Sequence, residues 1–520
     1  MSLLRTLSTV SGMTLLSRVT GLVRESIKAT AFGAGVQMDA FEVAFRLPNI
    51  LRRLFAEGAF SMAFVPIFAE YHRQRGEGPT RELMSRVGTL LAIALLAVTA
   101  IGVLAAPWLV YALASGFERT PGKVELTAQM IRIVFPYLLF VSLVSLAGGV
   151  LNVFHRFAIP AFTPVLLNLS IIGAALFLAP YCEPPILALA WGVLIGGVAQ
   201  LALQVRPLWR IGMLPTPRFD WRDPGVRRVL LAMGPAVLGV SAAQISALIN
   251  TQLAASLGDG RVSWITYADR LMEFPTALLG VALGTVLLPL LARHHADADP
   301  DEYSSLLDWG MRLAFLLALP AAVALWLLAV PLIATLYQYG RFTANDVLQT
   351  RDALLGYSVG LIGLVLVKIL APGFYARQMM KTPVKIALGT VLFAQTLAFL
   401  LMHRIGHAGL TLATSLGACL NAGLLYWGLR RRGIYRPGPG WLQFGARLAV
   451  ALGVLAGVLA AAAGTPADWI GATLGQRVAR LALICAGGGA VYFAALWLLG
   501  FRLRDFNRRD GARRAAEGER

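Results

Sequence analysis

Charged residues are scarce in this chain of 520 residues, and acidic ones are the scarcest of all. Asp, Glu, Lys and Arg together make up 14% of the sequence, against about a quarter in typical soluble domains. Hydrophobic residues make up 57%, and the mean hydropathy is +0.68, which excludes an ordinary soluble protein. We therefore predict an integral membrane protein with no sizeable soluble domain.

Cysteine and histidine are also rare, with three and six copies. Cys182, Cys419 and Cys485 stand far apart without a CxxC pair, so we expect free thiols. The histidines fall at the ends of predicted helices or in loops, so we expect no metal site. The chain also lacks a GxxxxGK[ST] loop, a nucleophile elbow and a paired-carboxylate site in a soluble domain. We therefore expect no enzymatic activity and no cofactor.

Apolar runs of about 18 to 25 residues, each long enough to cross the hydrocarbon core as a helix, recur from end to end. The sequence predicts an all-α integral membrane fold with fourteen transmembrane helices near residues 8–32, 38–70, 86–113, 126–152, 160–179, 185–205, 227–256, 263–292, 306–336, 347–374, 383–402, 408–429, 442–463 and 473–500. Arg18 interrupts the first run and no small-residue cleavage site follows, so we expect a first helix rather than a removed signal peptide.

Basic residues alternate strongly between the predicted loops. If the N-terminus is cytoplasmic, about 27 Lys and Arg lie on the cytoplasmic side and about five on the other. This bias predicts an even number of spans with both termini in the cytoplasm. It also accounts for much of the net charge of +19, so no nucleic-acid partner is needed.

A weak repeat suggests two parallel halves. Residues 44–48 (AFRLP) and 65–69 are echoed by 268–272 (ADRLM) and 288–292, in the second and eighth predicted helices. Since an even number of helices separates the copies, both would run in the same direction. The prediction is an N-lobe at 1–206, a C-lobe at 207–430, and a last helix pair with a basic tail at 431–520.

Charges inside three predicted spans carry the functional argument, because each costs about 2.5 to 3.5 kcal/mol at the bilayer centre unless it faces water or a partner. They are Arg18, Arg24, Glu25 and Lys28 in 8–32; Asp39, Glu42, Arg46, Arg52, Arg53 and Glu57 in 38–70; and Asp269, Arg270 and Glu273 in 263–292. The arginines outnumber nearby acids, and guanidinium groups suit phosphate. We predict a central, water-filled cationic cavity that binds an anion. Buried ion pairs or snorkelling side chains are the alternative, which fits Lys28, Glu42, Arg53 and Glu57 equally well.

Prolines mark possible bending points within the spans. Pro48 beside Asn49, Pro235, Pro275 and Pro372 each remove a backbone hydrogen bond. Such bends suit alternating access, in which one half rocks against the other, although static kinks would have the same sequence pattern.

Several segments resemble signatures of the MurJ/MviN lipid II flippase family. They are residues 17–25 (SRVTGLVRE), 44–60, 268–275 (ADRLMEFP), 370–377 with 381–383, and 418–424, which follow in order across the first twelve predicted helices. The resemblance implies the fold of the multidrug/oligosaccharidyl-lipid/polysaccharide exporter superfamily, with two six-helix lobes around a cavity. It also implies that the last helix pair forms a groove for a polyprenyl tail.

The resemblance further implies a substrate and a site. The substrate would be lipid II, undecaprenyl-pyrophosphate carrying the peptidoglycan precursor, moved from the cytoplasmic to the periplasmic leaflet of the bacterial inner membrane. Other partners would be membrane lipids and the cell-wall synthesis machinery. Arg18, Arg24, Arg52, Arg270, Ser17, Ser263 and Asn49 would bind substrate or line the cavity, and Asp39, Glu57, Asp269 and Arg53 would have gating or ion-pair roles.

One feature departs from the family pattern. Some members hold sodium with carboxylate help between the seventh, eleventh and twelfth helices, but this chain has no Asp or Glu in those spans. Gln244, Asn250, Gln395 and Asn421 would be neutral substitutes, so we expect energisation by membrane potential. Three rival functions remain: an O-antigen or other polysaccharide-lipid flippase, a drug/cation antiporter with an acidic cavity, and a non-transporting cell-wall scaffold.

Overall fold

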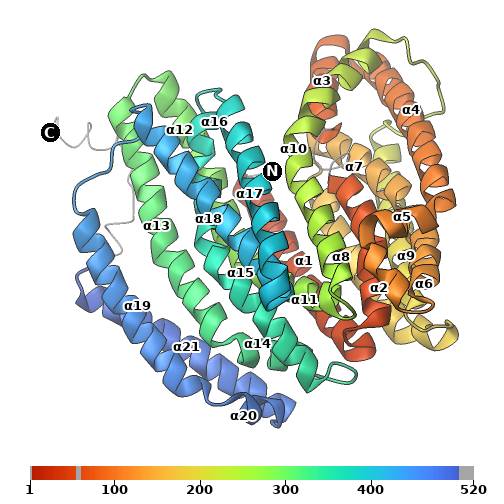
Figure 1. The fold of residues 1–520 in the computed structure, drawn as a ribbon. Helices are drawn as coiled ribbons and strands as arrows, with labels where there is room; N and C mark the ends of the chain where they lie inside the picture. Colours follow the sequence, from red (N-terminus) through yellow and green to blue (C-terminus); the bar gives the residue numbers. More distant parts are fainter. Residues whose placement is uncertain (1–2, 54–59, 503–520) are drawn as a thin grey trace. The chain divides into compact units, whose positions relative to one another are not determined.

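The computed structural model describes residues 3–53 and 60–502, and every regular element within these ranges is helical (Figure 1). The predicted all-α class is therefore confirmed. The three cysteines are free thiols, also as predicted. The chain forms two compact units, Met1–Tyr267 with Tyr337–Asp346, and Ala268–Leu336 with Val347–Arg520.

The first unit contains ten complete α-helices among the described residues and the start of an eleventh. They are α1 (Leu3–Phe32), α2 (Val36–Leu51), α3 (Phe60–Arg75), α4 (Glu77–Leu104), α5 (Ala106–Ala114), α6 (Lys123–Val134), α7 (Tyr137–Val153), α8 (Ala158–Gly173), α9 (Leu187–Arg210), α10 (Pro224–Ser256) and α11 (Arg261–Pro275). Short 3-10 or π-helical turns cover η2 (Ser115–Arg119), η3 (Ala174–Leu178) and η4 (Ala179–Tyr181).

The second unit holds the end of α11 and the helices that follow it, except that the last residue of α14 and the first three residues of α15 belong to the first unit. They are the π-helical η5 (Thr276–Val281), α12 (Ala282–Ala296), α13 (Pro300–Leu327), α14 (Ala329–Tyr337), α15 (Ala344–Leu370), α16 (Pro372–Tyr375), α17 (Lys381–Ile405), α18 (His407–Arg431), α19 (Trp441–Ala463), α20 (Pro466–Ile470) and α21 (Leu474–Leu498).

Ten helical segments among the described residues are long and apolar enough to cross a membrane. They coincide with ten of the fourteen predicted spans. The other four ranges, 8–32, 38–70, 227–256 and 263–292, contain α1, α2 with α3, α10, and α11 with α12. Three of these four ranges carry the clustered charges, which lower their hydropathy. The multi-pass membrane class is supported, and the number of fourteen crossings stays a prediction.

Prolines explain why several predicted single helices are interrupted. Pro107 stands in the first turn of α5, just after α4 ends, and Pro372 opens α16 just after α15 ends. Pro275 is the last residue of α11, and the backbone continues in the π-helical η5. A proline removes one backbone donor and crowds the preceding turn, so each of these helices stops or changes its winding there. The range 38–70, predicted as one helix, contains α2 and α3, and 54–59 are not described.

Aromatic and aliphatic side chains from α3, α4, α7 and α10 form a hydrophobic core in the first unit. Phe64, Phe68, Leu83 and Val150 are essentially inaccessible within it. The helix α10 packs against α3 and α5, although the sequence assigned it to the second lobe. The predicted lobe boundaries at residues 206 and 430 stay a prediction.

The last helix pair is attached to the rest of the second unit by a polar joint. The helices α19 and α21 lie side by side with α20 at their tip, and α19 also packs against α13 (Figure 1). At the joint, the carboxylate of Asp308 on α13 accepts hydrogen bonds from Tyr435 Oη at 2.7 Å, Trp441 Nε1 at 2.7 Å and Gly438 N at 3.1 Å. Because one buried acid receives donors from the whole α18–α19 connection, this connection has a defined path.

Candidate functional site

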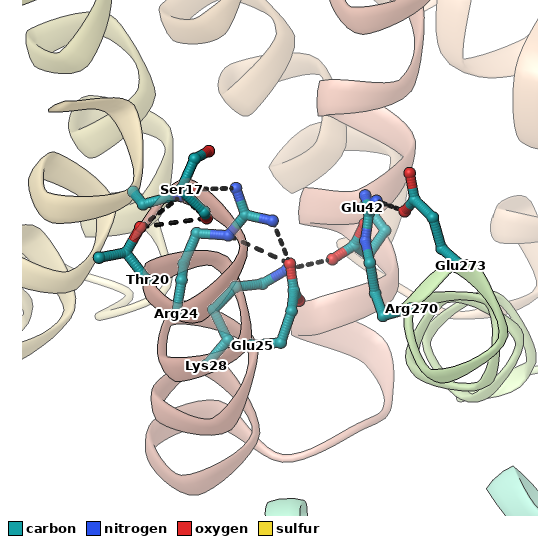
Figure 2. A network of polar contacts seen from close by, with 9 residues as sticks. Ser17, Thr20, Arg24, Glu25, Lys28, Glu42, Arg270 and Glu273 are labelled. Atoms are coloured by element: carbon teal, nitrogen blue, oxygen red, sulfur yellow. Dashed lines mark hydrogen bonds and ion pairs between the residues drawn. The ribbon is translucent and has the colours of Figure 1, made fainter. Parts of the chain in front are cut away.

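A chain of alternating charges joins α1 to α2 (Figure 2). The guanidinium of Arg24 contacts the carboxylate of Glu25, with Nε at 3.1 Å from Oε1. The other oxygen of Glu25 accepts from Lys28 Nζ at 2.8 Å, and Lys28 also contacts Glu42 Oε1 at 2.6 Å. Glu25, Lys28 and Glu42 are all buried. These four charges balance, so the alternative expectation of buried ion pairs is correct for Lys28 and Glu42.

Asn168 on α8 orients Arg24, the residue at one end of this series of charges. Its Oδ1 accepts from Arg24 Nη1 at 2.9 Å, while its Nδ2 donates to the Ser17 carbonyl and to Thr20 Oγ1, each at 3.0 Å. Ser17 thus takes part through its backbone, and Figure 2 shows it next to Thr20 and Arg24. Sequence reasoning missed Asn168. A lone amide in an otherwise apolar span is the signal that could have identified it.

Two further arginines beside this balanced group have no acidic partner. Arg18 on α1 and Arg46 on α2 are half-buried, and neither makes a hydrogen bond or ion pair with residues in 3–53 or 60–502. The Nε atom of Arg46 is shielded from solvent and still has no acceptor. The first two helices therefore carry unmatched positive charge, which supports the predicted cationic character of this region.

Asn49 and Arg52 are neighbours on one face at the end of α2. The Asn49 Oδ1 accepts from Arg52 Nη2 at 2.9 Å and from Nε at 3.2 Å. The two contacts orient the guanidinium of Arg52 on this face of the helix. Arg53, the next residue, is exposed. Glu57, expected in a gating or ion-pair role, lies outside the described residues.

Asp39 forms a separate and fully buried ion-pair centre in the first unit. Its carboxylate accepts from Lys123 Nζ at 2.9 Å, Gly260 N at 2.7 Å, and both the backbone N at 2.9 Å and the hydroxyl at 2.6 Å of Ser263. Lys123 also contacts Asp259 at 2.7 Å. The ion pair expected for Asp39 is therefore present, and it connects α2, α6 and the start of α11.

This centre changes the interpretation of two residues. Ser263 was expected to line the cavity, but it is completely inaccessible and its hydroxyl is bonded to Asp39. Its position indicates a structural role instead. Lys123, which lies between the predicted spans 86–113 and 126–152, opens α6 and is buried over the ring of Phe117 at 3.9 Å. A single lysine in a short loop gives no signal of a partner 84 residues away.

In the second unit, the remaining predicted site residues lie on the end of α11. Arg270 Nη1 donates to Glu273 Oε2 at 2.8 Å, one helical turn on. The Arg270 side chain is 26% exposed and that of Glu273 48% exposed, so water screens this pair. The neighbouring Asp269 is half-buried. Like Arg24, Arg270 is oriented by an acid on its own helix and remains accessible from outside the protein.

Comparison with known protein families gives a consistent result. The family model described as "Lipid II flippase MurJ" matches residues 28–474. The lipid II flippase MurJ of Burkholderia cenocepacia is 53% identical over 515 residues, which covers 98% of this chain and 100% of the relative. The probable lipid II flippase MurJ of Vibrio cholerae is 43% identical over 505 residues, covering 95% and 96%.

Solved structures show the same fold at lower identity. A structure titled "Lipid II flippase MurJ, inward closed conformation" matches with a TM-score of 0.81 and 21% identity, covering 96% of this chain and 99% of that one. An inward-facing multidrug resistance MATE family transporter of the MOP superfamily matches with a TM-score of 0.68 and 14% identity, covering 82% and 97%. The helical arrangement is therefore shared with transporters of both kinds.

Proposed function

Because this chain belongs to the lipid II flippase MurJ family, we propose that its function depends on unmatched arginines in α1 and α2 that hold the substrate's pyrophosphate. The protein is a lipid II flippase, a multi-pass membrane transporter that carries the lipid-linked peptidoglycan precursor between leaflets by alternating access. The direction would be from the cytoplasmic to the periplasmic leaflet of the inner membrane.

One observation carries this site assignment: Arg18 and Arg46 have no acid among the described residues, and both lie in helices that we propose to cross the membrane. A guanidinium at that depth is costly unless water or an anion compensates it. A pyrophosphate supplies several charged oxygens and can accept two parallel N–H bonds from one arginine. Bound substrate would therefore offset the dehydration of these side chains.

The contacts of Arg24 suggest how binding couples to the rest of the site. Arg24 shares the carboxylate of Glu25 with Lys28, and Lys28 in turn holds Glu42. A phosphate that draws Arg24 away from Glu25 would leave Glu25 and Glu42 sharing the single positive charge of Lys28. Each acid would keep one ionic contact, but the three remaining charges would sum to −1, so moving Arg24 to the substrate would have an electrostatic cost within the chain. Arg52 and Arg270 would complete the headgroup site, with Asn49 orienting Arg52.

The proposed organisation has fourteen crossings, lobes divided at residues 206 and 430, and both termini in the cytoplasm. The last helix pair would contact the polyprenyl tail. Exposed apolar side chains on α19 and α21, among them Val450, Val454 and Phe493, are suited to a long hydrocarbon chain. The cell-wall synthesis machinery, which uses the translocated precursor, is a proposed partner.

Rival functions make different demands on the same site. A polysaccharide-lipid flippase would share the isoprenoid anchor with its phosphates, and only the glycan would differ. A drug/cation antiporter would need surplus acid where α1 and α2 have surplus arginine. A non-transporting scaffold would not depend on Arg18, Arg24 or Arg270.

Complementation of a lipid II flippase depletion tests the assignment. We expect Arg18→Ala, Arg24→Ala and Arg270→Ala each to abolish growth while the protein still accumulates in the membrane. Growth at the wild-type rate from the triple variant would eliminate transport through this site. If the wild-type protein restores lipid II flipping but does not restore O-antigen display, the polysaccharide-lipid flippase is excluded.

A further inference from the structure

A pocket of about 520 Å³ lies at the tip of the last helix pair, and none of its lining residues belongs to the proposed transport site in α1 and α2. It is formed by the end of α19, by α20 and by the first turns of α21. Trp469 and Leu483 supply apolar surface, and Gln476, Arg477 and Arg480 supply donors. The proposed transport mechanism does not use it.

Arg477 places a fixed positive charge in the wall of this pocket. Only 4% of the residue is accessible, and its guanidinium donates to the Ala334 carbonyl at 2.9 Å and the Ile470 carbonyl at 2.8 Å. Both of these acceptors are neutral backbone atoms, and they fix the position of the guanidinium in the wall of the pocket. Arg477 thus ties α21 to α14 and α20 and makes the pocket electropositive.

Arg480, one turn further along α21, presents donors that the protein does not use. Its guanidinium lies 4.8 Å from the centre of the Trp469 ring, and Nη2 makes long contacts to the carbonyls of Ala462 at 3.3 Å and Ala463 at 3.4 Å. Nε and Nη1 make no hydrogen bond with any described residue. Three of the five N–H donors of an arginine therefore remain available.

The acid in the pocket does not neutralise both arginines. Asp468 accepts from the backbone N of Thr465 at 2.8 Å, and this hydrogen bond, with the nearby charge of Arg480, lowers the pKa of its carboxyl. Asp468 is therefore ionised at neutral pH. Two arginines against one carboxylate leave the pocket with a net positive charge.

Arg477 and Arg480 lie near the first residue of α21, at the end of a helix that is long and apolar enough to cross a membrane. Arg477 and Arg480 are three and six residues beyond Leu474, which places them about 5 and 9 Å along α21 from its first residue. Tryptophan and arginine are typical of the membrane–water interface, where an apolar body and a polar tip meet different surroundings. Leu483 follows one turn deeper and is 73% exposed.

We propose that this pocket binds the phosphate of an anionic phospholipid, with Arg480 donating through Nε and Nη1 and with Leu483 against the acyl chains. By the charge distribution of the loops, the lipid belongs to the periplasmic leaflet. A resident lipid here holds α20 between the two long helices. This site does not depend on the proposed transport site.

Native mass spectrometry of the full-length protein in detergent tests this binding. We expect phosphatidylglycerol to be retained in preference to phosphatidylcholine with the same acyl chains. Arg480→Gln should lower phosphatidylglycerol retention about tenfold or more, the size expected when a charge-assisted hydrogen bond to an anion is lost. Arg447→Gln, at the opposite end of the same helix pair, is the matched control and should leave retention unchanged.

Equal retention of both lipids by the wild type, or undiminished retention by Arg480→Gln, would overturn the proposal. If Arg480→Gln does not fold, Gln476→Ala replaces it, since Gln476 is exposed and should lose retention by a smaller factor. Excess inorganic phosphate distinguishes the sources of the anion. If phosphatidylglycerol stays bound in excess inorganic phosphate, the result supports a lipid site. If inorganic phosphate displaces it completely, the pocket is a site for free phosphate instead.

Discussion

Two groups of charges in the first unit, one around Asp39 and one around Arg18 and Arg46, follow opposite rules. Asp39 is completely buried and receives four donors from Lys123, Gly260 and Ser263. Arg18 and Arg46 are half-buried and have no partner among the described residues. In the first group, the buried carboxylate is fully paired within the protein and has a structural role. We propose that the second leaves charge for a ligand, in which case the degree of charge matching distinguishes structural from functional residues.

The largest effect is expected when the acid of the matched group, Asp39, is removed. Asp39→Leu leaves Lys123 buried beside a single, partly exposed acid, and we expect the free energy of unfolding to fall by about 3 to 5 kcal/mol. Thermal unfolding in detergent and the amount of protein in the membrane measure this. The double variant Asp39→Leu/Lys123→Met should recover part of the loss. Equal stability of the single variant and the wild type would contradict a structural role.

The unmatched group should respond in the opposite way. Arg18→Ala should lower the flipping rate at least about tenfold, because a charge-assisted contact to phosphate contributes about 1.5 to 3 kcal/mol, while the melting temperature stays near that of the wild type. A sealed-vesicle assay of headgroup accessibility measures the rate. Arg404→Ala, an exposed arginine at the end of α17, is the control and should flip normally. A large loss of stability in Arg18→Ala would place Arg18 with the matched group.

A smaller effect is expected from Asn168, which orients Arg24 and is neither a charged member of the matched group nor an unmatched arginine. Asn168→Ala removes the acceptor that orients Arg24, and the loss of one such hydrogen bond, about 1 kcal/mol, should slow flipping about fivefold. Asn168→Asp, which retains an acceptor for Arg24, should recover part of the rate. Asn345→Ala, at an exposed amide, is the control. Wild-type flipping by Asn168→Ala would mean that Arg24 needs no support from α8.

The smallest effect is expected where acids are absent altogether. The helices α10, α17 and α18 contain no Asp or Glu, so they lack a carboxylate for sodium. We expect flipping at the same rate in sodium and potassium salts, and no change in Gln395→Ala. Sodium-stimulated flipping that disappears in Gln395→Ala would contradict energisation by membrane potential alone.

Local sequence features predicted much of the fold. Apolar runs marked the helices because hydrocarbon demands long segments with internally satisfied backbones. Pro275 and Pro372 marked places where those helices stop or change winding, whereas Pro107 was not singled out and interrupts the predicted helix 86–113. The charged stretches in 8–32 and 38–70 were identified as exceptional because charge inside a span is costly.

The partners of those charges could not be read from the sequence. Asn168 lies 144 residues from Arg24, and Ser263 lies 224 residues from Asp39. Helical periodicity places residues on a face of their own helix, but it does not determine which other helix packs there. Ser263 was therefore expected at an open surface, although Asp39 binds it in the interior. Lys28 and Glu42 were ambiguous for the same reason.

Equilibrium binding of lipid II to the purified protein tests the central claim most directly. The unmatched arginines of α1 and α2 should supply much of the affinity, so Arg18→Gln/Arg46→Gln should bind lipid II at least about tenfold more weakly than the wild type. Asp39→Asn, provided that it folds, should bind nearly as well as the wild type. Affinity that is unchanged in the double arginine variant would contradict the account.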